Sequence, residues 1–241
     1  PEATGYGVVY FVQKMMETNG TGLKSKKVVI SGSGNVAQYA AEKAIQLGGI
    51  VLTLSDSSGY IFDSEGIDEE KLKHVMTLKN IKRERISSYI KKYPKAKFVA
   101  GKTPWEVACE VALPCATQNE LNEKDADLLI KNGCVCVGEG ANMPSTPEAI
   151  HQFTNHKILY APGKASNAGG VAVSGLEMAQ NSLRYNWSRE EVDAKLQSIM
   201  AEIHQSCLYY GKEEGYVNYV KGANIAGFVK VADAMLAQGV V

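Results

Sequence analysis

One segment, residues 27–37, limits the folds open to this chain more than any other. Its sequence, KVVISGSGNVA, has a short apolar strand, then the pattern G-x-G-x-x-A, then the first turn of a helix. Each small residue has its own steric reason: Gly32 allows a tight turn, Gly34 lets a ligand approach the backbone, and Ala37 lets helix pack on strand. A helix that starts beside such a turn offers free N–H groups to a phosphate.

Short apolar runs alternate with helical patterns along most of the sequence. Bounded by Gly, Pro or Ser, the runs predict six strands, at residues 28–30, 50–54, 97–99, 111–113, 135–137 and 158–160. Helix starts are predicted at Asn122, at Thr146 before Pro147, and at Ser188, which has Glu191 in the spacing of a capping box. We therefore predict an α/β fold with a doubly wound, mostly parallel Rossmann-type sheet.

From residue 167 onward the pattern is helical. Three long helices are predicted, at 167–186, 188–211 and 223–238, with no strand between them. In the last, apolar residues form one stripe before the stop signal Gly239, and they are Ile225, Phe228, Val229, Ala232, Met235 and Leu236. By default such a stripe packs on its own domain, but in a truncated chain part of it could have lost its partner. The simplest division is a dinucleotide-binding domain at 1–186 and a C-terminal helical extension at 187–241.

Charge and composition argue against several classes of function. Lys and Arg number 26, as do Asp and Glu, so no field of one sign would attract nucleic acid or an anionic membrane. No run approaches the ~20 apolar residues that span a bilayer. The five cysteines include no CxxC pair, no secretory signal precedes them, and the four histidines lack metal-site spacing. We expect a soluble, cytoplasmic protein with small-molecule ligands and no bound metal.

The end of the second strand bears on which dinucleotide is bound. Leu54 runs into Asp56, Ser57, Ser58 and Gly59. An acid at this point in a Rossmann fold bonds the ribose 2′-hydroxyl and favours NAD. The two serines favour NADP instead, because a hydroxyl can donate to a 2′-phosphate whereas a carboxylate repels it. These residues alone leave the choice open, and they are equally compatible with an ordinary surface turn.

Six motifs together resemble one enzyme family, the glutamate dehydrogenases of the hexameric, small-subunit type. Three of them follow predicted strands, where open α/β sheets bind ligands. The motifs are PEATGYG at 1–7, LPCATQNE at 113–120, EGANMP at 139–144, APGKASNAGGV at 161–171, SGLEM at 174–178 and GANIAGF at 222–228. The resemblance covers essentially the whole chain.

The resemblance implies a nicotinamide dinucleotide as cofactor. Residues 32–36 would hold the pyrophosphate, and four uncharged Thr and Asn side chains would line the nicotinamide end. NADP-using members resemble the chain at residues 56–59 and at Lys79, so NADP is implied, with NAD as the less favoured alternative. The implied cofactor residues are Thr4, Gly32, Ser33, Gly34, Asn35, Val36, Asp56, Ser57, Ser58, Lys79, Ala116, Thr117, Asn119, Asn142 and Asn167.

The family's reaction is the reversible oxidative deamination of L-glutamate to 2-oxoglutarate and ammonium. Val171 and Ser174 would meet the substrate, although Ser174 could instead bond back to its own helix. The resemblance places the catalytic Lys and Asp in an N-terminal domain before Pro1. We therefore expect a chain that starts inside a longer polypeptide, binds cofactor without turnover, and belongs to a full-length homohexamer.

Two other interpretations fit parts of the sequence. A leucine, valine or phenylalanine dehydrogenase would share the fold and the chemistry but would bind an apolar side chain. Ser174 and the segment at 161–164 favour glutamate over these substrates. A non-catalytic nucleotide-binding module would bind the cofactor with no enzymatic partner domain.

Overall fold

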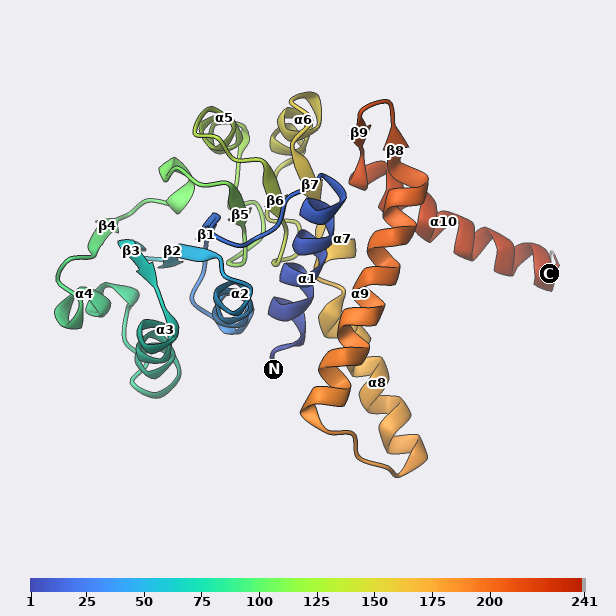
Figure 1. The fold of residues 1–241 in the computed structure, drawn as a ribbon, viewed down its shortest axis with the longest axis horizontal. Coiled ribbons are helices and arrows are strands. Elements are labelled where there is room, and N and C mark those ends of the chain that lie inside the picture. The colour runs from blue at the N-terminus through green and yellow to red at the C-terminus, as the bar shows by residue number, and fades with distance from the viewer. Residues whose placement is uncertain (240–241) are drawn as a thin grey trace.

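A seven-stranded sheet forms the centre of the computed structural model, which describes residues 1–239 (Figure 1). Its order is β4-β3-β2-β1-β5-β6-β7, so the direction of strand addition reverses between β1 and β5. The strands are β1 (Lys27–Ile30), β2 (Ile50–Asp56), β3 (Gly59–Ile67), β4 (Lys97–Ala100), β5 (Val111–Leu113), β6 (Cys136–Gly138) and β7 (Leu159–Ala161). All six predicted strands are present, and the mostly parallel Rossmann-type sheet is confirmed.

The strand β3 was not predicted, and it is the one antiparallel member of the sheet. It forms a hairpin with β2, in which the Ser58 backbone N–H donates to Asp56 Oδ1 at 2.9 Å. Gly59 has a φ of +142°, and a Cβ there would collide with the Val99 carbonyl oxygen. The sequence signal is weak because the second half of β3 carries Asp63, Ser64 and Glu65 in place of an apolar run.

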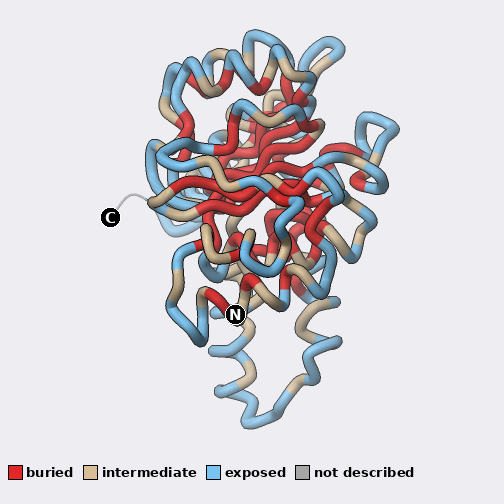
Figure 2. Tube along the Cα trace, turned by 90° about the vertical axis from the view of Figure 1, so that its left-hand side faces the viewer, coloured by how far each residue is buried: buried red, intermediate tan, exposed pale blue. Residues whose placement is uncertain are grey.

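Helices cover both faces of the sheet, as a doubly wound fold requires (Figure 1). Val28 and Ile30 face a core shared with α1, α2, α3 and α9, whereas Val29 faces a second core shared with α5 and α6. Figure 2 shows the strands as a buried layer between them. These helices are α1 (Ala3–Thr18), α2 (Asn35–Gln46), α3 (Glu69–Met76), α5 (Glu123–Lys131), α6 (Pro147–Asn155) and α9 (Arg189–Gly211).

Shorter helical segments connect the strands and helices. A π-helical turn, η1, continues directly from α3. The others are 3-10 or short α-helical turns, one of them between β7 and the C-terminal helices. In chain order the segments are η1 (Thr77–Ile81), η2 (Ile86–Ser88), α4 (Tyr89–Lys92), η3 (Pro104–Glu106) and α7 (Gly163–Ser166).

The helix α1 was also not predicted, and it is buried on nearly every side. Two glycines let its backbone touch its neighbours directly. A Cβ at Gly5 would lie 2.5 Å from the Ala40 nitrogen of α2, and one at Gly7 would lie 2.9 Å from the Gly169 Cα of α8 (Gly169–Leu183). The start of α1, which carries Thr4, is therefore fixed against the start of α2.

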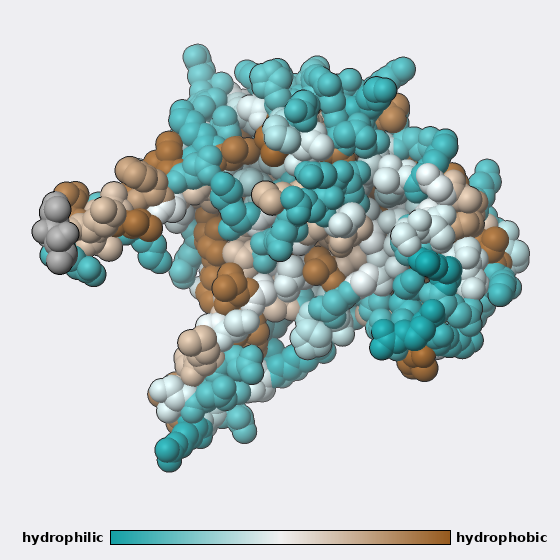
Figure 3. All heavy atoms as spheres, turned by 180° about the vertical axis from the view of Figure 1, so that it is seen from behind, coloured by the Kyte–Doolittle hydropathy of each residue, from teal (hydrophilic) through white to brown (hydrophobic). Residues whose placement is uncertain are grey.

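The C-terminal helices differ from the prediction in two respects. A two-stranded hairpin, β8 (Lys212–Glu213) and β9 (Tyr216–Val217), separates α9 from α10 (Tyr219–Gln238). Part of the α10 stripe does not pack on its own domain: Phe228 is 72% exposed and Leu236 is 81% exposed, whereas Ile225, Val229 and Ala232 are half-buried. Figure 3 shows α10 and α8 as two arms that leave the body, with apolar atoms along α10.

The predicted helix starts are confirmed. Asn122 and Ser188 form complete capping boxes, and Thr146 caps α6 ahead of Pro147. Within residues 1–239 no helix combines the length and the apolar character needed to cross a membrane.

We predict opposite stability effects for two Gly→Ala changes. Gly5→Ala should lower the free energy of unfolding by about 1–3 kcal/mol, because α1 and α2 must move apart. Gly175→Ala is the matched control: it lies within α8 with open space around it, so the change should stabilise by up to about 1 kcal/mol. Urea unfolding measures both, and a shift of the same sign in the two variants would contradict the packing argument.

Candidate functional site

A cleft of about 500 Å³ opens where the strand order reverses, at the carboxyl ends of β1, β5 and β6. It brings together seven of the predicted residues: Thr4, Val36, Ala116, Thr117, Asn142, Asn167 and Val171. Five more residues line it that were not predicted: Cys115, Gln118, Gly140, Ala141 and Gly170. These five lie inside the quoted motifs, but most offer only backbone or a small side chain, which gives no chemical signal in a sequence.

The glycine turn lies at one side of this cleft and has the predicted geometry. Gly32 has a φ of +83°, and a Cβ there would lie 3.0 Å from the Cys115 carbonyl oxygen. Gly34 is exposed with open space where its Cβ would be. It forms the N-cap of α2, whose first turn has no side-chain cap and no acidic residue. The positive end of α2 is therefore open to an anion.

Hydroxyl groups of the neighbouring strand β2 hold the glycine turn in place. Ser55 Oγ accepts from the Gly32 backbone N–H at 2.7 Å, and the Ser55 N–H donates back to the Gly32 carbonyl at 2.9 Å. The Thr53 hydroxyl accepts from the Ile30 N–H and donates to the Ile30 carbonyl, at 3.0 Å each. All these groups are buried, so the turn is rigid before any ligand arrives.

A buried carboxylate, Glu139, joins the loops that form the opposite wall. Its Oε2 accepts from the Gly163 N–H at 2.7 Å, and its Oε1 accepts from the Ser145 N–H at 3.2 Å and from the Tyr160 hydroxyl. Burial and this carboxylate raise the pKa of Tyr160. Sequence reasoning missed Glu139, since nothing in its motif indicates that its side chain turns inward.

Three of the four uncharged side chains predicted for the nicotinamide end, Thr4, Asn142 and Asn167, lie together in the cleft. Asn167 Nδ2 donates to Asn142 Oδ1 at 2.9 Å and to the Ala141 carbonyl at 3.3 Å, while Thr4 approaches Gly170 from α1. Within residues 1–239, the only ionisable side chain in the cleft lining is Cys115. Burial raises the pKa of its thiol, so no side chain of the lining itself is charged, while the Glu120 carboxyl accepts from the Ala116 and Thr117 N–H groups behind the lining.

Ten predicted residues lie outside the cleft lining: four in the glycine turn and the start of α2, four at the β2 tip and η1, and the two described here, Asn119 and Ser174. Asn119 has a φ of +54°, and its N–H donates to the Met143 carbonyl at 3.0 Å, which ties the loop after β5 to the loop after β6. Ser174 is exposed one turn beyond Val171, and its hydroxyl donates to the Gly170 carbonyl at 3.1 Å. Their contacts with cofactor and substrate remain predictions.

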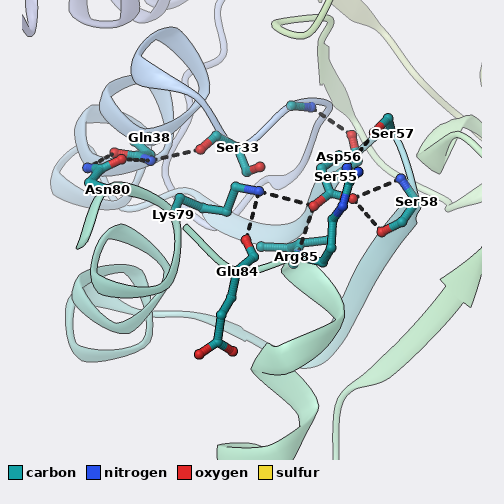
Figure 4. Close-up of polar contacts among 12 residues, drawn as sticks. Ser33, Gln38, Ser55, Asp56, Ser57, Ser58, Lys79, Asn80, Glu84 and Arg85 are labelled. Carbon is teal, nitrogen blue, oxygen red and sulfur yellow. Dashed lines mark hydrogen bonds and ion pairs between the residues drawn. The ribbon is translucent and has the colours of Figure 1, made fainter. Parts of the chain in front are cut away.

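The predicted adenosine end is a polar corner at the tip of β2, shown in Figure 4. Asp56 Oδ1 accepts from the Ser58 N–H and hydroxyl, at 2.9 and 2.5 Å. Its Oδ2 accepts from the Lys79 ammonium at 3.1 Å and from the Ile86 N–H at 2.8 Å. Partial burial opposes the charge, but bonds from Ser58, Ile86 and Lys79 outweigh it and lower the pKa of Asp56 to about 2.

A second cation, Arg85, completes this corner and was not predicted. Its guanidinium donates to the Ser57 hydroxyl at 2.6 Å, and both residues are exposed. The Glu84 carboxylate points away from the corner (Figure 4), while the Glu84 backbone carbonyl accepts from Lys79 at 3.1 Å. The sequence signal was available, since three of residues 82–85 are basic, but only the fold brings Arg85 to the β2 tip.

No metal site accompanies the cleft in the described part of the chain. Residues 1–239 contain no group of three or more His, Cys, Asp or Glu side chains placed to hold a metal ion. The five cysteines are all buried free thiols.

A family model described as Glutamate/Leucine/Phenylalanine/Valine dehydrogenase matches residues 1–239. The chain belongs to this dehydrogenase family. A glutamate dehydrogenase of Bacteroides thetaiotaomicron is 63% identical over the whole chain, which covers 54% of that protein. An NADP-specific glutamate dehydrogenase of Haemophilus influenzae is 57% identical, and an NAD-specific one of Bacteroides fragilis is 56% identical, each with the same coverage.

Solved structures of the dehydrogenase family agree with the sequence relatives. The crystal structure of Plasmodium falciparum glutamate dehydrogenase is 47% identical and matches the whole chain with a TM-score of 0.96, over 52% of its own length. The resemblance to glutamate dehydrogenases is thus confirmed. The chain spans about half the length of the relatives it matches.

We predict that the bonds of Asp56 are lost in acid. Because folding lowers its pKa from 3.8 to about 2, the stabilisation is complete above about pH 4 and disappears as the pH falls toward 2. At neutral pH, Asp56→Asn should lower the free energy of unfolding by about 1 kcal/mol, a value reduced for solvent screening. Urea unfolding of the wild type and the variant between pH 3 and 7 measures this difference in the free energy of unfolding, which should shrink as the pH falls. A difference that stays constant across the range would contradict the prediction.

Proposed function

We propose that this chain is the dinucleotide-binding part of an NADP-dependent glutamate dehydrogenase. One observation carries the proposal: an uncapped helix start beside a glycine turn opens into a neutral cleft at the point where the strand order reverses. Dinucleotides bind at this position in doubly wound sheets. The family match and the names of the similar relatives support the reaction class.

The residues present fit a nicotinamide dinucleotide along the whole length of the site. Residues 32–36 offer backbone N–H groups to the diphosphate. The paired amides of Asn142 and Asn167, with Thr4, offer donors and acceptors to a carboxamide without adding charge. When bound, the dinucleotide accepts or delivers the hydride, and this chain's own contribution is to bind and orient it.

The corner at the β2 tip favours a 2′-phosphate over a free ribose hydroxyl. Asp56 already accepts four hydrogen bonds, two on each oxygen, so it has no acceptor left for a 2′-hydroxyl. The exposed groups at the corner are donors, the Ser57 hydroxyl and the Arg85 guanidinium. With Asp56 paired to Lys79, Arg85 leaves the corner with a net positive charge.

The proposed reaction is the reversible oxidative deamination of L-glutamate to 2-oxoglutarate and ammonium. A base is required, and the cleft lining within residues 1–239 contains no Lys, Asp, Glu or His. We infer that the base comes from the part of the longer relatives that this chain does not cover. Residues 1–186 would bind the cofactor, and residues 187–241 would form the helical extension. Val171 and Ser174 would contact the substrate. The whole enzyme would be a hexamer.

A fluorescence titration with NADPH and with NADH tests the cofactor assignment. We expect tighter binding of NADPH, and Lys79→Ala and Arg85→Ala should each weaken it by about tenfold, because the first leaves the Asp56 charge unpaired beside the 2′-phosphate and the second removes a charge-assisted bond to it. Ser57→Asp should weaken NADPH at least as much, through repulsion. Affinity for NADH should change by less than about twofold in the two alanine variants.

The control for this titration is Lys91→Ala, which removes an exposed lysine on α4. It corrects for the general loss of one positive charge. Equal affinity of the wild-type chain for NADPH and NADH would overturn the NADP assignment, and no affinity for either would overturn the proposed function.

Turnover by the 241-residue chain is a separate test. We expect NADPH binding without glutamate oxidation, because the cleft lining within the described residues, 1–239, offers no Lys, Asp, Glu or His as a base. Measurement of NADPH formation from glutamate and NADP at high protein concentration, with a full-length relative as the positive control, checks this. Steady turnover by the purified chain would contradict the inference that the base lies elsewhere.

A further inference from the structure

A pair of side-chain amides, Gln38 and Asn80, connects the glycine turn to the π-helical turn η1 (Figure 4). Gln38 Nε2 donates to the Ser33 carbonyl at 2.7 Å and to Asn80 Oδ1 at 3.0 Å. Asn80 Nδ2 donates back to Gln38 Oε1 at 2.9 Å. Gln38 is 1% exposed, so its amide is committed to these bonds.

The first of these bonds sets the direction of one peptide plane. In the trans peptide between Ser33 and Gly34, the carbonyl and the N–H point in opposite directions. Since the Ser33 carbonyl faces Gln38, the Gly34 N–H points the opposite way, away from Gln38. This N–H is one of the backbone donors that the proposed function assigns to the diphosphate. Gln38 therefore fixes the direction in which the Gly34 N–H points.

The reciprocal bonds from Asn80 fix the Gln38 amide itself. The Ser33 carbonyl can only accept, so Gln38 must present its nitrogen to it. Asn80 bonds both ends of the Gln38 amide and so holds that orientation. The preceding residue, Lys79, bonds Asp56 at the β2 tip. The two neighbouring residues of η1 thus serve opposite ends of the site.

We propose that Gln38 and Asn80 are positioning residues that aim the Gly34 N–H at the dinucleotide diphosphate. The inference rests on the proposed function, which supplies the ligand. It assigns Asn80 a role separate from that of Lys79, which acts at the 2′-phosphate corner. Loss of either amide lets the Ser33–Gly34 peptide rotate, and binding of any dinucleotide weakens whether or not it carries a 2′-phosphate.

Three probes separate the two ends of the site. NADH carries the diphosphate without a 2′-phosphate, adenosine 2′-monophosphate carries the 2′-phosphate without a diphosphate, and NADPH carries both. Gln38→Ala should weaken NADH and NADPH by about tenfold each, which is about 1.4 kcal/mol, and adenosine 2′-monophosphate by less than twofold. Lys79→Ala should show the reverse pattern: weaker adenosine 2′-monophosphate and NADPH, with NADH unchanged.

Asn80→Ala provides a second variant that should fold normally, because Asn80 is exposed whereas Gln38 is buried. It should weaken NADH and NADPH by about threefold each. The Gln38→Ala/Asn80→Ala double variant should bind no more weakly than Gln38→Ala alone, because Asn80 acts through Gln38. Lys73→Ala, an exposed residue of the adjoining α3, is the matched control and should leave all three affinities unchanged.

Two results would overturn the inference while leaving the proposed function in place. One is wild-type affinity for NADH and NADPH in both amide variants. The other is an equal loss for all three probes, which would mean that the pair only holds α2 against η1. A wild-type chain that binds neither dinucleotide would instead refute the proposed function itself.

Discussion

The rigid connection between β1 and α2 is the constraint on which the rest of this site depends. A glycine turn is flexible by itself, and here buried hydroxyls of Thr53 and Ser55 bond its backbone from the next strand. The positive φ of Gly32 then directs the chain into α2 without a side-chain cap. A pre-formed and unpaired helix start costs little further ordering when an anion binds, which is the physical basis of the dinucleotide assignment.

Charge is distributed unevenly along the site, and the distribution matches the chemistry proposed for each end. The cleft near Asn142 and Asn167 is neutral, and its loops are joined by the buried Glu139 rather than by surface contacts. The β2 tip carries Lys79 and Arg85, with Asp56 turned inward. In the proposed function, a group from outside this chain would do the proton chemistry, whereas the cationic tip would recognise the 2′-phosphate.

The acid at the β2 tip shows why a motif alone could not predict cofactor preference. In the sequence, Asp56 indicates NAD by the general rule for Rossmann folds. In the structure its four donors come from Ser58, Lys79 and Ile86, two of them more than twenty residues away. An acidic side chain recognises a ribose hydroxyl only if its oxygens are free, and that depends on which loops pack against it.

Local sequence determined the strand–turn–helix unit, the alternation of strands and helices, and the caps at Asn122, Thr146 and Ser188, since each depends on residues close together in the chain. The antiparallel β3, the buried α1 and the exposed face of α10 were decided by tertiary structure. A half-polar strand forms only beside two partners, and a mostly apolar helix is recognisable only from what covers it. The glycine turn could be predicted from the sequence because its steric limits act between neighbouring residues. The hydrogen-bond partners of Glu139, Gln38 and Arg85 could not be predicted, because bonds between distant residues exist only after folding brings them together.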